Sequence, residues 1–445
     1  MRRIAVLPLA LIMAACQDQP TGPEPGDGPS LAAAKKEPAV APITVIASPP
    51  RSLGYTQGDV FRYHNRPEPD LGGDRVVWRH MENPYYGSVN VFQAHLPGGA
   101  TTRLAELGTY AGPHTSGRYT TWQDGETGIM LLDNVTGQRR RIEGTQPFAG
   151  SVDIAGDKLA YLDLGTQAIM VYDIPTGARL TVALWGPAVT YHYVRGMGFD
   201  GRYVAWISDG ARGESGLGLV VNDIVTGREI VAVPFGQGSM SGPSVDRGRV
   251  VFSMQVGDRE SVFLYDIASG TTRRISDAPG RQTNPEISGD LIVWDDTRQD
   301  NNPAYVFNHD VYLYDLKAGV ETPLANDATW SGDPQVDGSR VVWTERRNNR
   351  WEVLVVDLVP VSLPALRDEL RRMTASGAVR SAGVARSLDA FLSQATAAQS
   401  AGNRARAADR LRQFAAHVRQ HAGKQIEASA ARRLEGLAAG VIARL

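Results

Sequence analysis

The fold of this chain is decided by a segment near its middle, Pro285-Glu286-Ile287-Ser288-Gly289-Asp290-Leu291-Ile292-Val293-Trp294. Its Gly-Asp turn is followed by a β-branched run that ends in an aromatic residue, which predicts a tight turn leading into a buried strand. Further along, Val311-Tyr312-Leu313-Tyr314-Asp315-Leu316 is a second apolar run, closed by an aspartate and followed by a turn at Gly319. The two runs predict two strands of one sheet.

Both patterns repeat along the chain. The first recurs, with its turn glycine and terminal aromatic, at Gly73 to Trp78, Gly117 to Trp122, Gly156 to Tyr161, Gly201 to Trp206, Gly248 to Phe252, Gly289 to Trp294 and Gly338 to Trp343. The second recurs, with its aspartate, at Asp133, Asp173, Asp223, Asp266, Asp315 and Asp357. Because the turn glycines are 39 to 49 residues apart, the length of one propeller blade, the predicted fold class is an all-β propeller of about seven four-stranded blades over residues 43–362.

The repeated residues have structural explanations. An aromatic side chain that ends a buried strand fills the wedge between two blades. The aspartate of the second pattern caps its own turn by accepting backbone N–H bonds, so these aspartates are interpreted as structural and not catalytic. Residues 44–62 are a candidate outer strand that closes the ring with the last blade.

The repeat resembles the TolB-like family of propellers, most clearly at residues 285–294 and 311–316. The resemblance extends over residues 68–358 and implies the propeller fold. It does not imply one function, because propellers serve both as binding proteins and as enzymes.

The first fifteen residues have the pattern of a secretory signal. Arg2 and Arg3 precede a short apolar run that ends in small residues before Cys16, the only cysteine of the chain. This placement resembles the lipobox of bacterial lipoproteins, although Met13 departs from the usual Leu, Val or Ile. The resemblance implies cleavage after residue 15 and a lipid on Cys16.

Residues 16–42 are rich in Pro, Gly and Ala without hydrophobic periodicity, which indicates a flexible tether. Gln17 follows the cysteine where lipoproteins retained at the inner membrane have an aspartate. The predicted location is therefore the cell envelope, as an outer-membrane lipoprotein on the periplasmic or surface side.

Residues 363–445 change to the three- and four-residue spacing of amphipathic helices, with breaks at Gly377, Gly402 and Gly423, which predicts a small all-α bundle. From Gly402 to Ala430 the sequence resembles the FIMAH domain of exported bacterial proteins. The segment has 14 basic and 6 acidic residues, about +8, against −2 for the whole chain. Its basic face has four interpretations: a solvated surface, or contact with anionic lipid, nucleic acid or the acidic propeller.

The search for chemistry yields no coherent catalytic set. A G-x-S-x-G pattern at 238–242 contains Ser241, but Pro243 and a predicted strand follow where a nucleophile elbow needs a helix. The eight histidines form no zinc motif, and no second cysteine is present. We therefore predict no catalytic residue, no metal site and no cofactor.

Two polar segments near the end of the propeller are candidate ligand-binding loops on one face of the ring. Oxygen-rich loops of this kind can also hold calcium, although the EF-hand spacing is absent, and a solvated hairpin without a ligand is the favoured alternative. Their candidate site residues are Asp295, Asp296, Arg298 and Asp300 in the first, and Glu345 and Arg346 in the second.

These observations favour a non-enzymatic envelope protein that presents its propeller as a platform for an envelope protein or a glycan. Membrane contact is expected through the lipid anchor only. No nucleic-acid partner is expected, since 46 basic residues are balanced by 48 acidic ones. The alternative is a propeller enzyme, a polysaccharide lyase or hydrolase with histidines or carboxylates lining its central channel.

Overall fold

The computed structural model describes residues 45–445 except 49, 57–65, 82–88, 108–111, 125–126, 146–150, 185–193, 195, 210–214, 299–307, 326–328 and 349. The predicted signal peptide, Cys16, the tether and Asp300 lie outside the described residues. Among the described helices, none is long and apolar enough to span a membrane.

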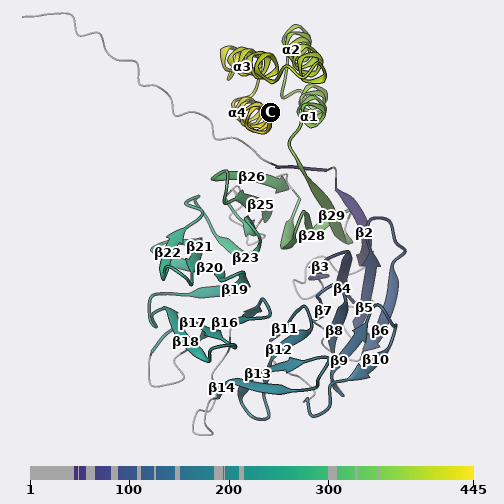
Figure 1. Ribbon diagram of the computed structural model, residues 1–445, viewed down its shortest axis with the longest axis vertical. Helices are drawn as coiled ribbons and strands as arrows, with labels where there is room; N and C mark the ends of the chain where they lie inside the picture. Colours follow the sequence, from purple (N-terminus) through teal and green to yellow (C-terminus); the bar gives the residue numbers. More distant parts are fainter. Residues whose placement is uncertain are drawn as a thin grey trace, which may run out of the picture. The chain divides into compact units, whose positions relative to one another are not determined.

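The strands form seven antiparallel sheets arranged in a ring (Figure 1), which confirms the predicted propeller. Blade one consists of β3 (Asp70–Gly72), β4 (Arg75–Met81), β5 (Val89–His95) and β6 (Thr102–Leu107). Blade two consists of β7 (His114–Thr115), β8 (Tyr119–Asp124), β9 (Gly128–Asp133) and β10 (Arg139–Arg141). Blade three consists of β11 (Val152–Ala155), β12 (Lys158–Asp163), β13 (Ala168–Asp173) and β14 (Arg179–Leu184). Blade four consists of β15 (Met197–Phe199), β16 (Tyr203–Ser208), β17 (Gly218–Asp223) and β18 (Arg228–Val233). Blade five consists of β19 (Met240–Asp246), β20 (Arg249–Val256), β21 (Arg259–Asp266) and β22 (Thr271–Arg274). Blade six consists of β23 (Gln282–Ser288), β24 (Leu291–Asp296), β25 (Asp310–Asp315) and β26 (Val320–Ala325).

The seventh blade closes the ring with an N-terminal strand. It contains β27 (Ser331–Asp337), β28 (Arg340–Arg347) and β29 (Arg350–Pro360), and the last of these pairs with both β1 (Val45–Ala47) and β2 (Arg51–Thr56). The N-terminal segment therefore supplies the outer strand in two pieces along one long partner. The expectation that residues 44–62 close the ring is confirmed for β1 and β2, and residues 57–62 lie outside the described part of the chain.

The core of the propeller lies between the blades. Seven clusters of buried apolar side chains each join two neighbouring blades, and each contains one aromatic residue from the first repeat, namely Trp78, Trp122, Tyr161, Trp206, Phe252, Trp294 or Trp343. The first strands of neighbouring blades also contact one another around the whole ring. The aromatic residues fill the wedges between blades, as predicted.

The repeated aspartates cap turns. Asp173 Oδ1 accepts the backbone N–H of Thr176 at 3.0 Å, and Asp266 Oδ1 accepts that of Ser269 at 2.8 Å. Hydrogen bonds within the turn hold the pKa of both carboxyls below the usual range. These aspartates are structural, as the sequence analysis expected.

The C-terminal part consists of α1 (Leu363–Ala375), α2 (Ala382–Ser400), α3 (Arg404–His421) and α4 (Ala428–Arg444). Side chains of Ser362, Ser381 and Asn403 cap the first three helices by accepting a backbone N–H. The apolar residues that recur at helical spacing form one buried cluster, with Leu366, Leu388, Leu411, Phe414, Leu434 and Leu437 each 0% exposed.

Candidate functional site at the central channel

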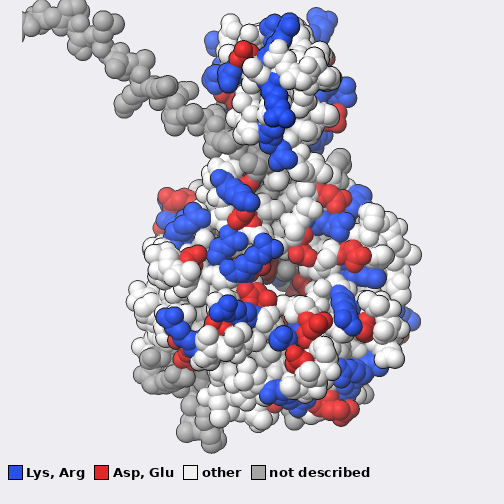
Figure 2. Space-filling model, in the orientation of Figure 1, with Lys and Arg blue, Asp and Glu red and all other residues white. Residues whose placement is uncertain are grey.

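One position in the first strand of every blade faces the central channel. This residue pairs with the one that precedes the wedge aromatic in the second strand, and the seven residues are Asp70, His114, Asp153, Gly198, Ser244, Glu286 and Gln335. All seven line one cavity of about 190 Å³. We call them the channel ring. Figure 2 shows a hollow at the middle of the disc with acidic side chains around it.

In four of the seven blades the chain turns into the channel through a residue of positive φ that precedes a proline, two positions before the ring residue. Glu68, Gly242, Asn284 and Asp333 have φ values of 44°, 51°, 49° and 53°, and a proline follows each of them. The strand register also shifts at this point in the last three blades, between residues 241 and 244, 283 and 286, and 332 and 335. Proline fits such a bulge because no ladder hydrogen bond is required of its nitrogen.

Part of the channel ring joins neighbouring blades. Asp70 Oδ2 accepts the backbone N–H of Thr115 at 2.6 Å, and Asp153 Oδ2 accepts that of Phe199 at 2.7 Å. Ser244 Oγ accepts the backbone N–H of Ile287 at 3.3 Å. In each case the donor directly follows the ring residue of the next blade. These bonds fix the positions of the ring side chains.

The channel ring opposes the ionisation of its own carboxyl groups. Burial raises the pKa of Asp70, and it raises the pKa of Glu286 to about 7, to which the charge of Asp70 contributes. Burial also raises the pKa of Asp153 well above its usual range, and the charges of Asp70 and Glu286 raise it further. The one basic side chain of the ring is His114, with Nδ1 3.7 Å from Asp70 Oδ2. The cavity is therefore a site that favours positive charge or bound protons.

The sequence analysis missed the channel ring, although a signal for it exists. Each ring residue stands eight positions before the wedge aromatic of its blade, from Asp70 and Trp78 to Gln335 and Trp343. This offset is constant, whereas the residue type changes from blade to blade. A search for repeated residue types passes over such a position, and a search for repeated spacing finds it.

The C-terminal helices are the part of the chain that a family model identifies. Residues 363–443 match the FIMAH domain. This match confirms the resemblance of the C-terminal segment. No curated protein matches the chain in sequence.

Solved structures similar to the chain include several propellers. The β-propeller domain of the Trilobed protease from Pyrococcus furiosus has 10% identity and a TM-score of 0.48, over 72% of this chain and 98% of that one. An oligogalacturonate lyase in complex with manganese has 13% identity and a TM-score of 0.49, over 72% and 98%. TolB from Acinetobacter baumannii has 13% identity and a TM-score of 0.36, over 63% and 80%. These likenesses concern the fold alone.

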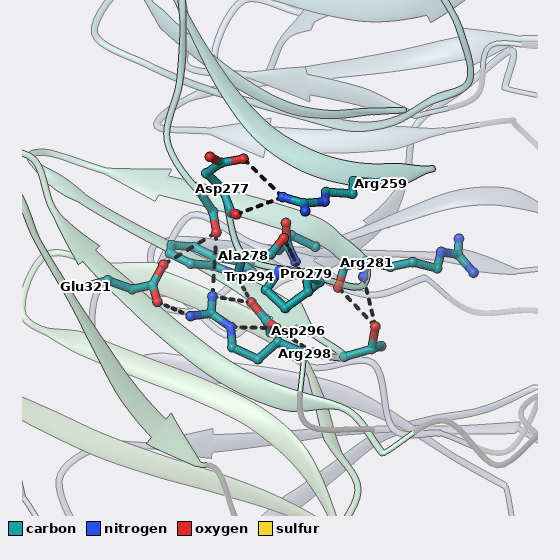
Figure 3. Close-up of polar contacts among 12 residues, drawn as sticks. Arg259, Asp277, Ala278, Pro279, Arg281, Trp294, Asp296, Arg298 and Glu321 are labelled. Atoms are coloured by element: carbon teal, nitrogen blue, oxygen red, sulfur yellow. Dashed lines mark hydrogen bonds and ion pairs between the residues drawn. The ribbon is translucent and has the colours of Figure 1, made fainter. Parts of the chain in front are cut away.

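The described candidate residues of the first polar segment, Asp295, Asp296 and Arg298, lie in or directly after a strand. Asp295 and Asp296 end β24, and both are 0% exposed. Asp296 accepts hydrogen bonds from Trp294 Nε1 at 2.9 Å and from Arg298 Nε at 2.9 Å. The guanidinium of Arg298 also bonds Glu321 (Figure 3). It lies 3.9 Å from the ring centroid of Tyr312. This arrangement is a structural clamp within blade six.

The second polar segment follows the same plan in blade seven. Glu345 and Arg346 lie within β28, and Glu345 is 3% exposed. Its carboxylate accepts a hydrogen bond from Trp343 Nε1 at 3.0 Å and pairs with Arg347. The sequence segments Trp-x-Asp-x-Arg and Trp-x-Glu-x-Arg therefore build equivalent clamps. Ligand binding at these residues stays a prediction.

Asp295 connects the first candidate segment to one mouth of the channel. Its Oδ1 accepts the backbone N–H of Asp333 at 2.9 Å, and its Oδ2 accepts a hydrogen bond from Asn284 Nδ2 at 2.8 Å. Arg66 Nη1 lies 2.8 Å from Asp333 Oδ1. Burial raises the pKa of both aspartates. Asn284 and Asp333 stand two residues before Glu286 and Gln335, so Asp295 supports the backbone that presents these two ring residues.

Other candidate chemistry of the sequence is not assembled in the described part of the chain. Ser241 lies in β19 and donates a hydrogen bond to Glu260 at 3.2 Å, without the strand, turn and helix of a nucleophile elbow. In the FIMAH domain, the rings of His417 and His421 meet edge to face on one helix, with centroids 4.6 Å apart. Among the described residues no group of three or more His, Cys, Asp or Glu could hold a metal ion.

Proposed function

We propose that this chain is an exported, lipid-anchored envelope protein whose propeller is a non-enzymatic binding platform for an envelope protein or a glycan. We further propose that the channel ring receives a cationic group of that ligand, a lysine or arginine side chain or an amino sugar. The observation that supports this proposal is the convergence of one residue from every blade, Asp70, Asp153 and Glu286 among them, on a single cavity.

The charge of the cavity supports a cationic ligand. Buried carboxylates that raise one another's pKa gain stability when a positive group neutralises their repulsion. The volume of about 190 Å³ corresponds to roughly six molecules of liquid water. This space suits the end of one side chain or one sugar ring. The same charge repels nucleic acids and polyuronates.

The test is titration calorimetry of the full chain carrying Cys16→Ala, with a hexalysine peptide as the probe. Asp153→Asn with Glu286→Gln is expected to weaken binding at least tenfold, because two of the three ring carboxyls lose their charge. The matched control is Asp258→Asn with Glu143→Gln, two exposed positions of the propeller. Binding should strengthen from pH 6 to pH 8 as Glu286 ionises. Equal affinities in the channel and control variants would contradict the cationic site.

A specific observation favours the enzyme as second candidate. A carboxyl with a pKa of about 7, in a cavity that also holds a histidine, suits general acid–base catalysis near neutral pH. Glycan cleavage by the wild-type chain that is lost in Glu286→Gln would establish the enzyme and overturn the non-enzymatic proposal. The repulsion of polyuronates by the channel ring points to a neutral or cationic glycan as substrate.

A further inference from the structure

We propose that one end of the FIMAH domain is a second membrane contact, which binds the anionic phosphate headgroups of membrane lipid. The proposal deepens the envelope function above and rests on the lipid anchor at Cys16. It is carried by the distribution of charge within the FIMAH domain and by the route along which the chain enters that domain.

All the acidic side chains of the FIMAH domain take part in ion pairs. Each of the six forms an ion pair with an arginine of the same domain: Asp368 with Arg371, Glu369 with Arg372 and Arg433, Asp389 with Arg367, Asp409 with Arg412, Glu427 with Arg380, and Glu435 with Arg419. Within the described residues, the seven basic side chains left without an ion pair are Arg386, Arg404, Arg406, Arg410, Lys424, Arg432 and Arg444. These seven side chains account for seven of the domain's eight net positive charges, and the eighth arises because Glu369 pairs with two arginines.

Four of the seven lie at the same end of the bundle. The helices are joined by the short connections 376–381, 401–403 and 422–427, so neighbouring helices run antiparallel. The start of α1, the turn between α2 and α3 and the end of α4 therefore share one end. Arg404, Arg406 and Arg410 begin α3, and Arg444 ends α4. We call these four residues the basic end; Figure 2 shows how basic side chains gather over the helices in that view.

Folding does not account for the basic end. Arg404 and Arg406 occupy the first turn of α3, where the positive end of the helix dipole disfavours cations, and no acidic residue stands in that turn. Both side chains are exposed, so neither contributes to the buried cluster of the bundle. Arginines that oppose the helix dipole without contributing to stability indicate a function at that surface.

The route of the chain places the basic end near the proposed anchor. β1 pairs with the last residues of β29, and Ile46 is buried in the same apolar cluster as Val361 and Leu363, where α1 begins. The first described residue, Val45, therefore lies close to the start of α1, at the end of the bundle that holds the four arginines. From Cys16 to Val45 there are 28 intervening residues, and the composition-based prediction of a flexible tether implies a span of roughly 30 Å for this length. An anchor at Cys16 would hold the basic end within reach of the bilayer surface.

Anionic headgroups fit this surface. Each arginine close to an anionic membrane favours binding by about fivefold, and this attraction weakens as salt shortens the screening length. Four arginines on one end act together because the bilayer presents many phosphates in one plane. The tether adds a high local concentration of the membrane, so a weak contact of this kind is occupied once the lipid is inserted.

The experiment measures vesicle binding without the lipid. The full chain with Cys16→Ala is sedimented with phosphatidylcholine vesicles that contain 30% phosphatidylglycerol or none. We expect at least tenfold tighter binding to the anionic vesicles at low salt, and loss of the difference at high salt. Replacing the basic end by Arg404→Gln, Arg406→Gln, Arg410→Gln and Arg444→Gln should weaken binding at least tenfold, with helicity unchanged by circular dichroism.

The matched control removes four charges elsewhere. Arg371→Gln and Arg412→Gln remove paired arginines of the FIMAH domain, and Arg228→Gln and Arg273→Gln remove exposed arginines of the propeller. This variant should bind within twofold of the parent chain. Equal weakening by both quadruple variants, equal binding to both vesicle types, or tighter binding to a DNA oligonucleotide than to anionic vesicles would each overturn the proposal.

A separate arm tests the anchor. Cells that express the wild-type chain are labelled with a fatty acid, and the label is expected on wild type and not on Cys16→Ala. If wild type carries no label, the lipid anchor and the tethered arrangement are overturned. The affinity of the basic end for anionic lipid still stands in that case, provided that vesicle binding is as expected. The protein variants used in the vesicle experiment should all bind hexalysine at the channel ring with the same affinity. Calorimetry with hexalysine therefore tests the channel site, and vesicle sedimentation tests the basic end.

Discussion

Glu286 shows how a single residue is constrained by its place in the ring. Its carboxyl lies in the central cavity with Asp70 and Asp153, and Gln335 Nε2 donates a hydrogen bond to it at 3.4 Å. Burial raises its pKa from the ordinary 4.5 to about 7, because little water reaches the ionised form, and the charge of Asp70 contributes to this rise. The folded chain therefore binds this proton more tightly than the unfolded chain does.

This shift gives stability a defined pH dependence at the residue scale. The contribution of Glu286 is complete below about pH 4.5 and is lost as the pH rises through about 7. Glu286→Gln should stabilise the propeller by up to about 3 kcal/mol at pH 8 and by little at pH 5. Urea unfolding followed by tryptophan fluorescence measures this, since all eight tryptophans lie before residue 352. Equal effects at the two pH values would refute the shift; exposed Glu143→Gln is the control.

At the scale of elements, each blade depends on its neighbour for a core. The second strand of each blade carries the wedge aromatic into a cluster that is shared with the preceding blade. Phe252 is 0% exposed and stacks on Phe263, with ring centroids 5.8 Å apart. Its cluster reaches back to Ala205 and Ile207 of blade four. A wedge aromatic therefore stabilises an interface between two sheets as well as its own sheet.

Truncating a wedge side chain to alanine should lower the free energy of unfolding more than replacing it by another large apolar side chain. Phe252→Ala leaves a cavity between blades four and five and is expected to destabilise the propeller by about 3 to 5 kcal/mol. Phe252→Leu keeps most of the apolar volume and should cost only about 1 to 2 kcal/mol. The shift in the urea midpoint measures both. A loss below about 1 kcal/mol for the alanine variant would show that the wedge is not filled by this ring.

At the scale of the whole molecule, the ring is held closed by a short N-terminal segment. β1 and β2 pair with opposite halves of β29, so two segments about 300 residues apart in sequence share one sheet. Arg51 Nη2 adds an ion pair with Asp357 Oδ2 at 3.1 Å. Without these strands the outer edge of β29 would present unpaired backbone groups to solvent.

Removing the closing strand tests this arrangement. A chain that lacks residues 1–57 should melt roughly 10 °C or more below one that lacks residues 1–42, because the first loses the outer strand and the second loses only the predicted signal and tether. The shorter chain should also associate through the exposed edge of β29, which size-exclusion chromatography detects. Equal melting temperatures for the two chains would show that closure does not depend on β1 and β2.

Much of this fold could be predicted from the sequence because it depends on local patterns. The turn at Gly289 and the strand that ends in Trp294 are set by neighbouring residues, and seven copies of that pattern imply seven blades. The helices after Ser362 follow in the same way from their apolar spacing and caps. In contrast, the polar segment that begins at Asp295 was expected to be a solvated loop, and β24 buries its first two residues.

The sequence by itself determined the repeat, the wedge aromatics, the turn aspartates and the helical C-terminal part, because each of these depends on residues that are close together along the chain. Only the tertiary structure decided that Asp70, Asp153 and Glu286 share one cavity, because ring closure brings together positions 83 and 133 residues apart in sequence. It also decided that Ile46 is buried in the same apolar cluster as Leu363, 317 positions further along the chain. Long-range packing sets these neighbours, and no local pattern encodes them.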